Sequence, residues 1–363
     1  MSRTLTAELT VSPTSSNRGL SAAIDACRPE LASAQVSDVS APPRISVTEA
    51  ASRPPDQDAR APQTSRAHQA ITAVVVFGPL LGTAVAALML FRDQASVANL
   101  AVAVVLYLVT GHGLTAGFHR MCTHRAFRAR RLTKIVLVVA GSLALEGGVL
   151  GWSANHRRHH AYTDVEGDPH SPHLSGRSLI GQLRGALHAH LGWLFRPQPE
   201  ARERWIPDLL ADRDLVVLDR LFPLFCLASF ALPALLGFAI SGSAAGMLGG
   251  LLWGGLVRVF VLQQATFAVN SACHLWGTRP FRTRRSDQAR NLAALAVVSF
   301  GENWHNLHHS LPRLARHGVG RHEWDSTARL IAILEKLSLV VEVRWPDADV
   351  LSARRRRDVP EER

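Results

Sequence analysis

The chain has 363 residues, of which 40 are Lys or Arg, 29 are Asp or Glu and 47% are hydrophobic, and its formal net charge is +11. Its four cysteines show no paired spacing, which excludes a disulfide framework and a CxxC zinc or redox motif. The basic residues lack the aromatic interleaving and module signatures of nucleic-acid-binding proteins, so we expect no nucleic-acid partner. Residues 1–69 have no sustained apolar period and predict a disordered N-terminal tail without a signal peptide.

Four long apolar segments follow the tail in two pairs. They cover residues 71–90, 96–118, 222–240 and 246–269. Each is long enough to cross about 30 Å of hydrocarbon as a helix. The turns within the two pairs carry one basic residue in total, whereas residues 118–221 carry fifteen. By the positive-inside rule we expect a multi-pass protein of the cytoplasmic (inner) membrane whose termini and central segment face the cytoplasm.

A further apolar stretch, residues 132–152, contains Lys134 and Glu146. Both charges are costly at bilayer depth, so we predict a helix that lies at the interface and does not cross. If it crossed, the histidines before it and after it would lie on opposite faces of the membrane.

Nine of the 17 histidines follow the second and fourth apolar segments or form two HxxHH groups. They are His119, His124, His156, His159, His160, His274, His305, His308 and His309. Residues i, i+3 and i+4 share one helix face, so we expect each HxxHH group to present three nitrogen donors to one point. Two such groups would hold two metals between them. Imidazole suits iron, copper, zinc and nickel, and the lack of cysteine pairs argues against structural zinc, which leaves iron as the leading candidate.

The other eight histidines are interpreted as structural or surface residues, with His170 shaping a loop or supporting a ligand. They are His68, His112, His170, His173, His188, His190, His317 and His322.

Several motifs of the chain occur together in one known family. They are "TAGFHRMCTHRAF", "HRRHH", "DPHSPH", "HLGWLF", "VNSACH", "GENWHNLHH" and "ARHG". Over residues 71–346 the chain resembles the membrane fatty-acid desaturases of the Δ9 acyl-CoA and acyl-lipid group. The resemblance implies an all-α integral membrane fold, in which four transmembrane helices in two hairpins lie under a cytosolic helical cap with a di-iron site. It divides the chain into the tail, a desaturase domain at 70–346 and a basic C-terminal tail at 347–363.

The resemblance also implies the chemistry. The nine histidines would bind two iron ions, and Asn270 would approach one of them through a water molecule. With O₂ as co-substrate, the enzyme would introduce a cis double bond at Δ9 of a saturated chain carried as acyl-CoA or acyl-lipid. A di-iron lipid hydroxylase of the same superfamily is the alternative. No haem-binding "HPGG" segment is present, so a separate ferredoxin or flavin reductase would supply electrons.

Five residues are candidate substrate contacts, and one of them is Arg196, for the headgroup. Trp152, Trp193 and Thr266 are candidate walls of an acyl tunnel, and Tyr107 is a candidate for its closed end; core packing is the alternative for each. The acyl carrier is left undecided between CoA and a phospholipid. The case for CoA is weakened because Ala154 and Asn155, rather than charged residues, precede His156, and because Arg196 lacks an adjacent lysine.

Three further features have expected partners. Arg258 lies inside an apolar segment and needs a buried partner or a wet cavity. Glu302 is a candidate acceptor for a ligand histidine, with a solvated helix end as the alternative. The run "RRRR" at 354–357 is interpreted as a solvated tail, with contact to lipid or to the electron donor as the alternative.

Overall fold

Four long helices of the computed structural model can cross a membrane. The structure describes residues 66–91, 96–196 and 202–356, all within one unit of the chain. The candidate spans are Gln69–Leu90, Val97–Thr123, Phe222–Ser241 and Ala244–Leu275. This confirms the expected four spans and the all-α class. Nearly all of the predicted tail, and Arg357, lie outside the described residues.

The spans consist of helices α2 (Arg66–Phe91), α3 (Val97–His112) and α9 (Phe222–Ser241), and of a composite fourth helix. α3 continues into the π-helix η1 (Gly113–Thr123). The fourth span runs from α10 (Ala244–Gly250) through the π-helix η4 (Leu251–Val257) into α11 (Arg258–Leu275). The second and fourth helices therefore extend past their apolar segments, and each extension carries histidine.

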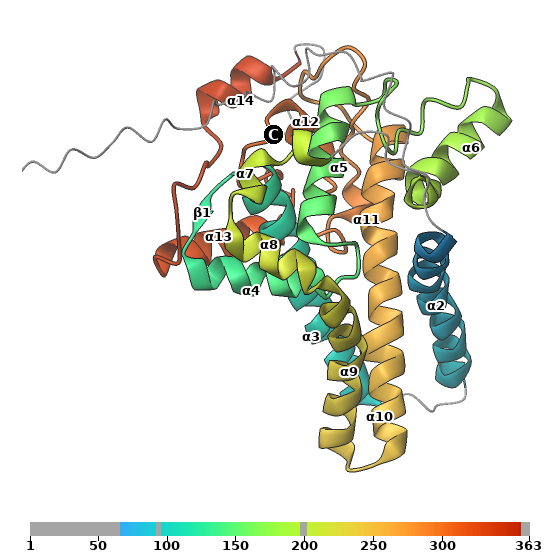
Figure 1. Cartoon of the computed structure of the whole chain (residues 1–363). Helices are drawn as coiled ribbons and strands as arrows, with labels where there is room; N and C mark the ends of the chain where they lie inside the picture. The colour runs from blue at the N-terminus through green and yellow to red at the C-terminus, as the bar shows by residue number, and fades with distance from the viewer. Residues whose placement is uncertain (1–65, 92–95, 197–201, 357–363) are drawn as a thin grey trace, which may run out of the picture. The chain divides into compact units, whose positions relative to one another are not determined.

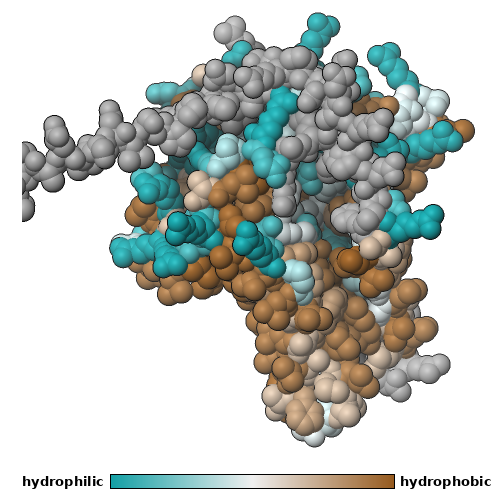
Figure 2. Space-filling view, viewed as in Figure 1, coloured by the Kyte–Doolittle hydropathy of each residue, from teal (hydrophilic) through white to brown (hydrophobic). Residues whose placement is uncertain are grey.

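Apolar side chains cover the outer faces of the spans. Val74, Leu81, Leu227 and Leu235 are more than 60% exposed, and Figure 2 shows a continuous hydrophobic surface over the lower part of the helices. Water would solvate such a surface poorly, whereas lipid tails would cover it.

Glycine allows α9 and α10 to approach closely. A Cβ at Gly250 would lie 2.1 Å from the carbonyl oxygen of Pro233. Small residues at a helix contact let the backbones meet in this way, and the second hairpin depends on it.

A helical cap lies at one end of the spans (Figure 1). Antiparallel pairing of β1 (Arg128–Ala129) with β2 (Val340–Val341) adds a two-stranded sheet. The helices of the cap are α4 (Arg131–Ser142), α5 (Val149–Tyr162), α6 (Leu179–His190), η2 (Gly192–Phe195), η3 (Arg202–Arg204), α7 (Pro207–Leu210), α8 (Arg213–Arg220), η5 (Ala293–Leu295), α12 (His305–Ser310), α13 (Ser326–Lys336) and α14 (Ala348–Arg354).

The stretch 132–152 does not form one helix. It contains most of α4 and the start of α5, and the chain between them adopts positive φ at Leu145 (61°) and Gly147 (100°). These left-handed residues end the helical hydrogen-bonding pattern. Lys134 pairs with Asp212 at 2.5 Å, which satisfies a charge that the bilayer interior would not tolerate. The expectation of a non-crossing segment agrees with the spans found among the described residues.

The interpretation of 354–357 as a solvated tail is wrong for residues 354–356. The amide of Arg282 donates to the carbonyl of Arg354, and the amide of Arg356 donates to the carbonyl of Pro280, both at 2.8 Å. Backbone hydrogen bonds with Pro280 and Arg282 attach this segment to the cap, and the charge of the segment alone could not predict them.

Arg258 has the buried partners that its position requires. Its guanidinium donates to the carbonyls of Leu143 (2.6 Å), Ser229 (2.9 Å) and Gly254 (3.0 Å). Because these bonds join α11 to α9 and to the chain after α4, the charge fixes the cap to the spans.

Candidate metal centre

Histidines from η1, α5, α11 and α12, together with His124 directly after η1, meet in the interior of the protein and form two groups. The first group contains His119, His124, His156, His160 and His308, and the second contains His159, His274, His305 and His309. In each group one nitrogen per ring lies within 4.8 Å of all the others. The nine histidines that the sequence singled out are thus brought together.

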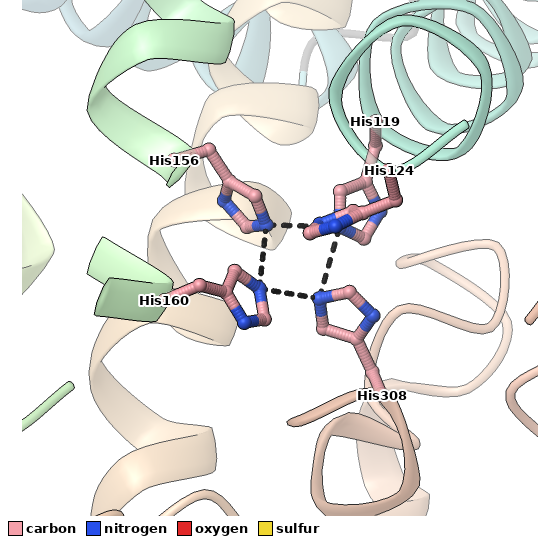
Figure 3. Close-up of side chains that lie close together, drawn as sticks. All are labelled: His119, His124, His156, His160 and His308. Carbon is pink, nitrogen blue, oxygen red and sulfur yellow. Dashed lines mark hydrogen bonds between the residues drawn. The ribbon is translucent and has the colours of Figure 1, made fainter. Parts of the chain in front are cut away.

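The first group points its Nε2 atoms at one centre (Figure 3). Nε2 of His119 lies 3.0 Å from that of His156 and 3.1 Å from that of His308. Nε2 of His160 lies 2.8 Å from that of His308. These rings come from three separate elements, so only the folded cap creates this centre.

The second group has the same arrangement. Nε2 of His305 lies 3.1 Å from that of His274 and 3.0 Å from that of His309. His159 completes it, with its Nε2 3.3 Å from that of His309. All four rings are in the buried interior.

The expectation that each HxxHH group serves one point is wrong. His156 and His160 belong to the first group, whereas His159 belongs to the second; in the other box His305 and His309 belong to the second group and His308 to the first. On a helix, positions i and i+4 differ by about 40° but i+3 and i+4 differ by about 100°. Each box therefore lies between the two groups and contributes to both.

Carboxylates orient four of these rings through Nδ1. Glu302 lies 2.7 Å from His119, Asp168 2.9 Å from His159, Asp164 2.9 Å from His274 and Asp287 3.0 Å from His309. A ring that donates its Nδ1 proton to a carboxylate presents an unprotonated Nε2 to the centre, which is the tautomer that a metal requires.

Glu302 has the acceptor role expected of it, but its partner is His119 rather than the neighbouring His305. The buried guanidinium of Arg120 also donates to Glu302 and bonds Asp325 at 3.0 Å. Sequence reasoning missed the three aspartates. The signal for two of them was their position in "TDVEGDPH", directly after the first HxxHH box.

The electrostatics favour cations at both centres. Burial lowers the pKa of His156, His160 and His308 well below the usual value, and it lowers the pKa of His309 to about 4 although Asp287 opposes this. Burial alone would raise the pKa of Asp168, but its close contact and hydrogen bond with the His159 ring lower it to about 2. Neutral rings with converging lone pairs and anionic supports fit metal ions that accept nitrogen ligands.

The nine histidines of the two groups lie within a segment that matches a known protein family. The model of the fatty acid desaturase family matches residues 95–328. The chain belongs to the fatty acid desaturase family.

Three relatives illustrate the range of this family. The desaturase is 36% identical over 279 residues to the hex-5-enoyl-acyl-carrier-protein acetylenase of Moorena producens, covering 76% of this chain and 86% of the relative. It is 34% identical to the sn-1 stearoyl-lipid 9-desaturase of Anabaena variabilis, covering 74% of this chain and 92% of the relative. It is 34% identical to acyl-CoA desaturase 1 of Saccharomyces cerevisiae, covering 66% of this chain and 45% of the relative.

Two of the remaining histidines lie against the centres of the desaturase. His317 is buried, its ring centroid lies 4.6 Å from that of His308, and its Nδ1 lies 3.3 Å from Glu302. His317 is thus a structural residue, as expected, and its contacts place it beside the first histidine group. His170 stacks on His159 at 4.2 Å, in agreement with a supporting role.

Three others make structural contacts between elements. His112 bonds the hydroxyl of Ser326, and His190 bonds Ser271. His173 bonds the carbonyl of His274. The side chain of His68 lies outside the described residues.

Two adjacent cavities that share lining residues approach the centres. The outer cavity has a volume of about 480 Å³, and its walls include Glu146, Trp193 and Arg196. The deep cavity has a volume of about 40 Å³ and reaches His119, His156 and His305. The two share a set of lining residues at their junction, Trp152, His156, Thr266 and Asn270.

These cavities include most of the candidate substrate contacts. Trp152 and Thr266 line both cavities, and Trp193 and Arg196 line the outer one. Tyr107 lines neither; its ring packs against Phe300, a wall of the deep cavity, at 5.3 Å. Sequence reasoning missed Phe300, because nothing in its local pattern distinguishes it from a core residue.

Proposed function

We propose that this desaturase introduces a cis double bond at Δ9 of a saturated acyl chain carried as acyl-CoA or acyl-lipid, with two iron ions and O₂. The observation that carries the proposal is the deep cavity, because its wall contains histidines of both groups next to apolar side chains. An alkyl chain in this cavity would pass beside both metals. Removing hydrogen from unactivated carbons requires an oxidant at that position.

The metal ligands of the proposal are the nine histidines, with Asn270 acting through a water molecule. When bound, the two iron ions would supply the oxidising chemistry for which no side chain is suited. Glu302, Asp164, Asp168 and Asp287 keep protons on the Nδ1 atoms and lone pairs on the Nε2 atoms. These carboxylates fix the ring orientations before any metal binds.

The cavities account for binding and positioning of the substrate. The headgroup end of the acyl chain would lie near Arg196, which is exposed at the rim, and beside Trp193. Trp152 and Thr266 stand at the junction, where the chain would enter the deep cavity. Apolar walls exclude water and hold the reacting carbons at one place, which limits attack at the wrong carbon.

A second candidate is alkyne formation on a chain that already contains a double bond. It is favoured by the relative from Moorena producens, which is named an acetylenase of a hex-5-enoyl chain. The same site would serve, because the second reaction removes two further hydrogens from the same pair of carbons.

The proposal also covers the membrane orientation of the enzyme, its electron donor and its acyl carrier. The cap and both termini would face the cytoplasm from the inner membrane. A separate ferredoxin or flavin reductase would supply the electrons. The relatives are named for acyl-CoA, acyl-lipid and acyl-carrier-protein substrates, so the carrier is part of the test.

The test is expression of the full chain and of His119→Ala in a bacterial host under air with a ferredoxin and its reductase. Membrane fatty acids are then analysed by gas chromatography and mass spectrometry after a derivatisation that locates double bonds. A new bond at carbon 9 that is absent in the variant supports the proposal. A hydroxylated chain would assign the enzyme to the hydroxylases, and an alkyne to the acetylenases. Iron-loaded protein that forms no product with any carrier would contradict all three.

A further inference from the structure

We propose that Phe300 closes the acyl cavity and restricts the desaturase to chains whose reacting carbons lie only a few carbons from the methyl end. This rests on the proposed function, since it takes the deep cavity as the binding site of the acyl chain. It names Phe300 as a residue that determines specificity.

The sizes of the two cavities give the first argument. The outer cavity holds about 480 Å³, whereas the deep cavity, which contains the approach to both histidine groups, holds about 40 Å³. A chain that enters through the outer cavity meets His156 where the two cavities share their lining, and it reaches His119 and His305 only in the small one. Most of its length therefore lies before the reacting carbons, and little space remains beyond them.

Phe300 lies in the wall of the deep cavity together with Val298 and Ser299. Its side chain is 2% exposed, so the ring belongs to the interior rather than to the lipid-facing surface. Val298 is 37% exposed. This wall of the deep cavity thus combines the buried ring of Phe300 with the partly exposed Val298, and removing the ring would open space there for a longer chain.

The backbone holds Phe300 in an unusual conformation. Its φ angle is 59°, and the next residue, Gly301, has a φ of 102°. A bulky residue with positive φ is uncommon and persists only where the surrounding structure requires it. The amide of Thr327 donates to the carbonyl of Phe300 at 3.2 Å. The ring itself lies against Gly111 of α3.

The neighbours of Phe300 are shaped to accept its ring. A Cβ at Gly111 would lie 2.1 Å from Cε2 of Phe300, so only glycine leaves room there. The rings of His112 and Tyr107 pack against it at 4.7 Å and 5.3 Å. The hydroxyl of Tyr107 also donates to the carbonyl of Val298 at 2.6 Å. Three residues of α3 therefore fix the end of the cavity.

The position of the ring is tied to the metal centre. Two residues after Phe300 stands Glu302, whose carboxylate lies 2.7 Å from Nδ1 of His119. One short segment thus sets both the orientation of a ligand histidine and the end of the cavity. The distance from the centre to the methyl end of the chain is consequently fixed.

The experiment compares the full chain with Phe300→Ala and Phe300→Leu in membranes supplied with ferredoxin, its reductase and saturated acyl chains from decanoyl to octadecanoyl. The cavity left by Phe300→Ala should lengthen the preferred chain by about three methylenes, and Phe300→Leu should lengthen it less. The position of the new double bond, counted from the carboxyl end, should stay the same. The control is Phe127→Ala, which removes another ring that is 2% exposed but lines neither cavity; it should keep the wild-type profile.

A binding measurement separates this inference from the proposed function. Without O₂, the purified proteins are heated with each acyl chain, and the rise in melting temperature is recorded. Short chains should stabilise the wild type, and Phe300→Ala should extend the effect to longer chains. Identical chain profiles for the wild type and both variants would overturn the inference, even if desaturation occurs. Wild-type protein that binds short chains but forms no product would contradict the proposed function and leave the inference supported.

Discussion

Nδ1 of His119 lies 2.7 Å from a carboxylate oxygen of Glu302, which also pairs with the buried Arg120. This contact joins the second span to the segment that contains the last histidine box. Because the carboxylate is held by two partners, it orients the imidazole before any metal binds.

Replacing Glu302 with Gln should therefore weaken metal binding. Loss of a carboxylate behind a ligand histidine typically lowers metal affinity by about 10-fold to 100-fold. Competition with an iron chelator measures the change. The control is Glu342→Gln, whose carboxylate is exposed and pairs only with exposed Arg128 among the described contacts. Equal iron affinity in both variants would show that Glu302 does not support the site.

The division of each HxxHH box between two centres predicts a pattern of metal loss. His156→Ala with His160→Ala damages only the first group, so about one iron per chain should remain. His156→Ala with His159→Ala damages both groups, and less than one should remain. Metal analysis of the purified proteins distinguishes the pairs, with exposed His322→Ala as the control. The two double variants would retain the same amount of iron if each box served a single metal.

Glu146 predicts a pH dependence of substrate binding. Burial raises the pKa of its carboxyl to about 8, and Trp152 Nε1 approaches it at 3.4 Å. Below about pH 8 the outer cavity has a neutral wall here, whereas above it an anion faces the acyl chain, so KM should rise. His170 and Arg196 line the same cavity, and both are present in the wild type and in the Glu146→Gln variant, so their own titration affects both proteins equally.

Glu146→Gln should abolish that rise in KM with pH, and measuring KM for both proteins from pH 6 to pH 9 tests it. The raised pKa of Glu146 also makes the stability of the folded protein depend on pH. Because the folded pKa is above the ordinary value, the contribution of this carboxyl is fully present below pH 4.5 and is lost as pH rises toward 8. The melting temperature of Glu146→Gln relative to wild type should thus increase with pH. Parallel pH profiles of the two proteins would refute the assignment.

Tyr107→Ala should lengthen the preferred acyl chain less than Phe300→Ala does. Tyr107 lines neither cavity and acts through its packing against Phe300 and its bond to Val298. Its loss lets the Phe300 ring move without removing it. Product analysis over a series of chain lengths measures the shift, and Tyr107→Phe, which keeps the ring, should stay close to wild type. An unchanged profile in Tyr107→Ala would mean that this ring has only a packing role.

The sequence determined the features that depend on local pattern. Apolar runs long enough to cross a bilayer predicted the four spans, since membrane insertion depends on the hydrophobicity of a continuous segment. The nine histidines were identifiable because spacings such as that of His305, His308 and His309 are properties of a single helix. The resemblance of these motifs to the desaturases is confirmed by the family match.

Only the tertiary structure decided how those residues combine. Asp287 supports His309, and Phe300 packs against Gly111, although no local pattern connects either pair. The same holds for the division of the histidines between two centres, because a helical box presents donors over a wide angle and its surroundings select the partner of each ring. The physical reason is that packing of distant segments, rather than local spacing, sets the distances on which metal binding and the length of the acyl cavity depend.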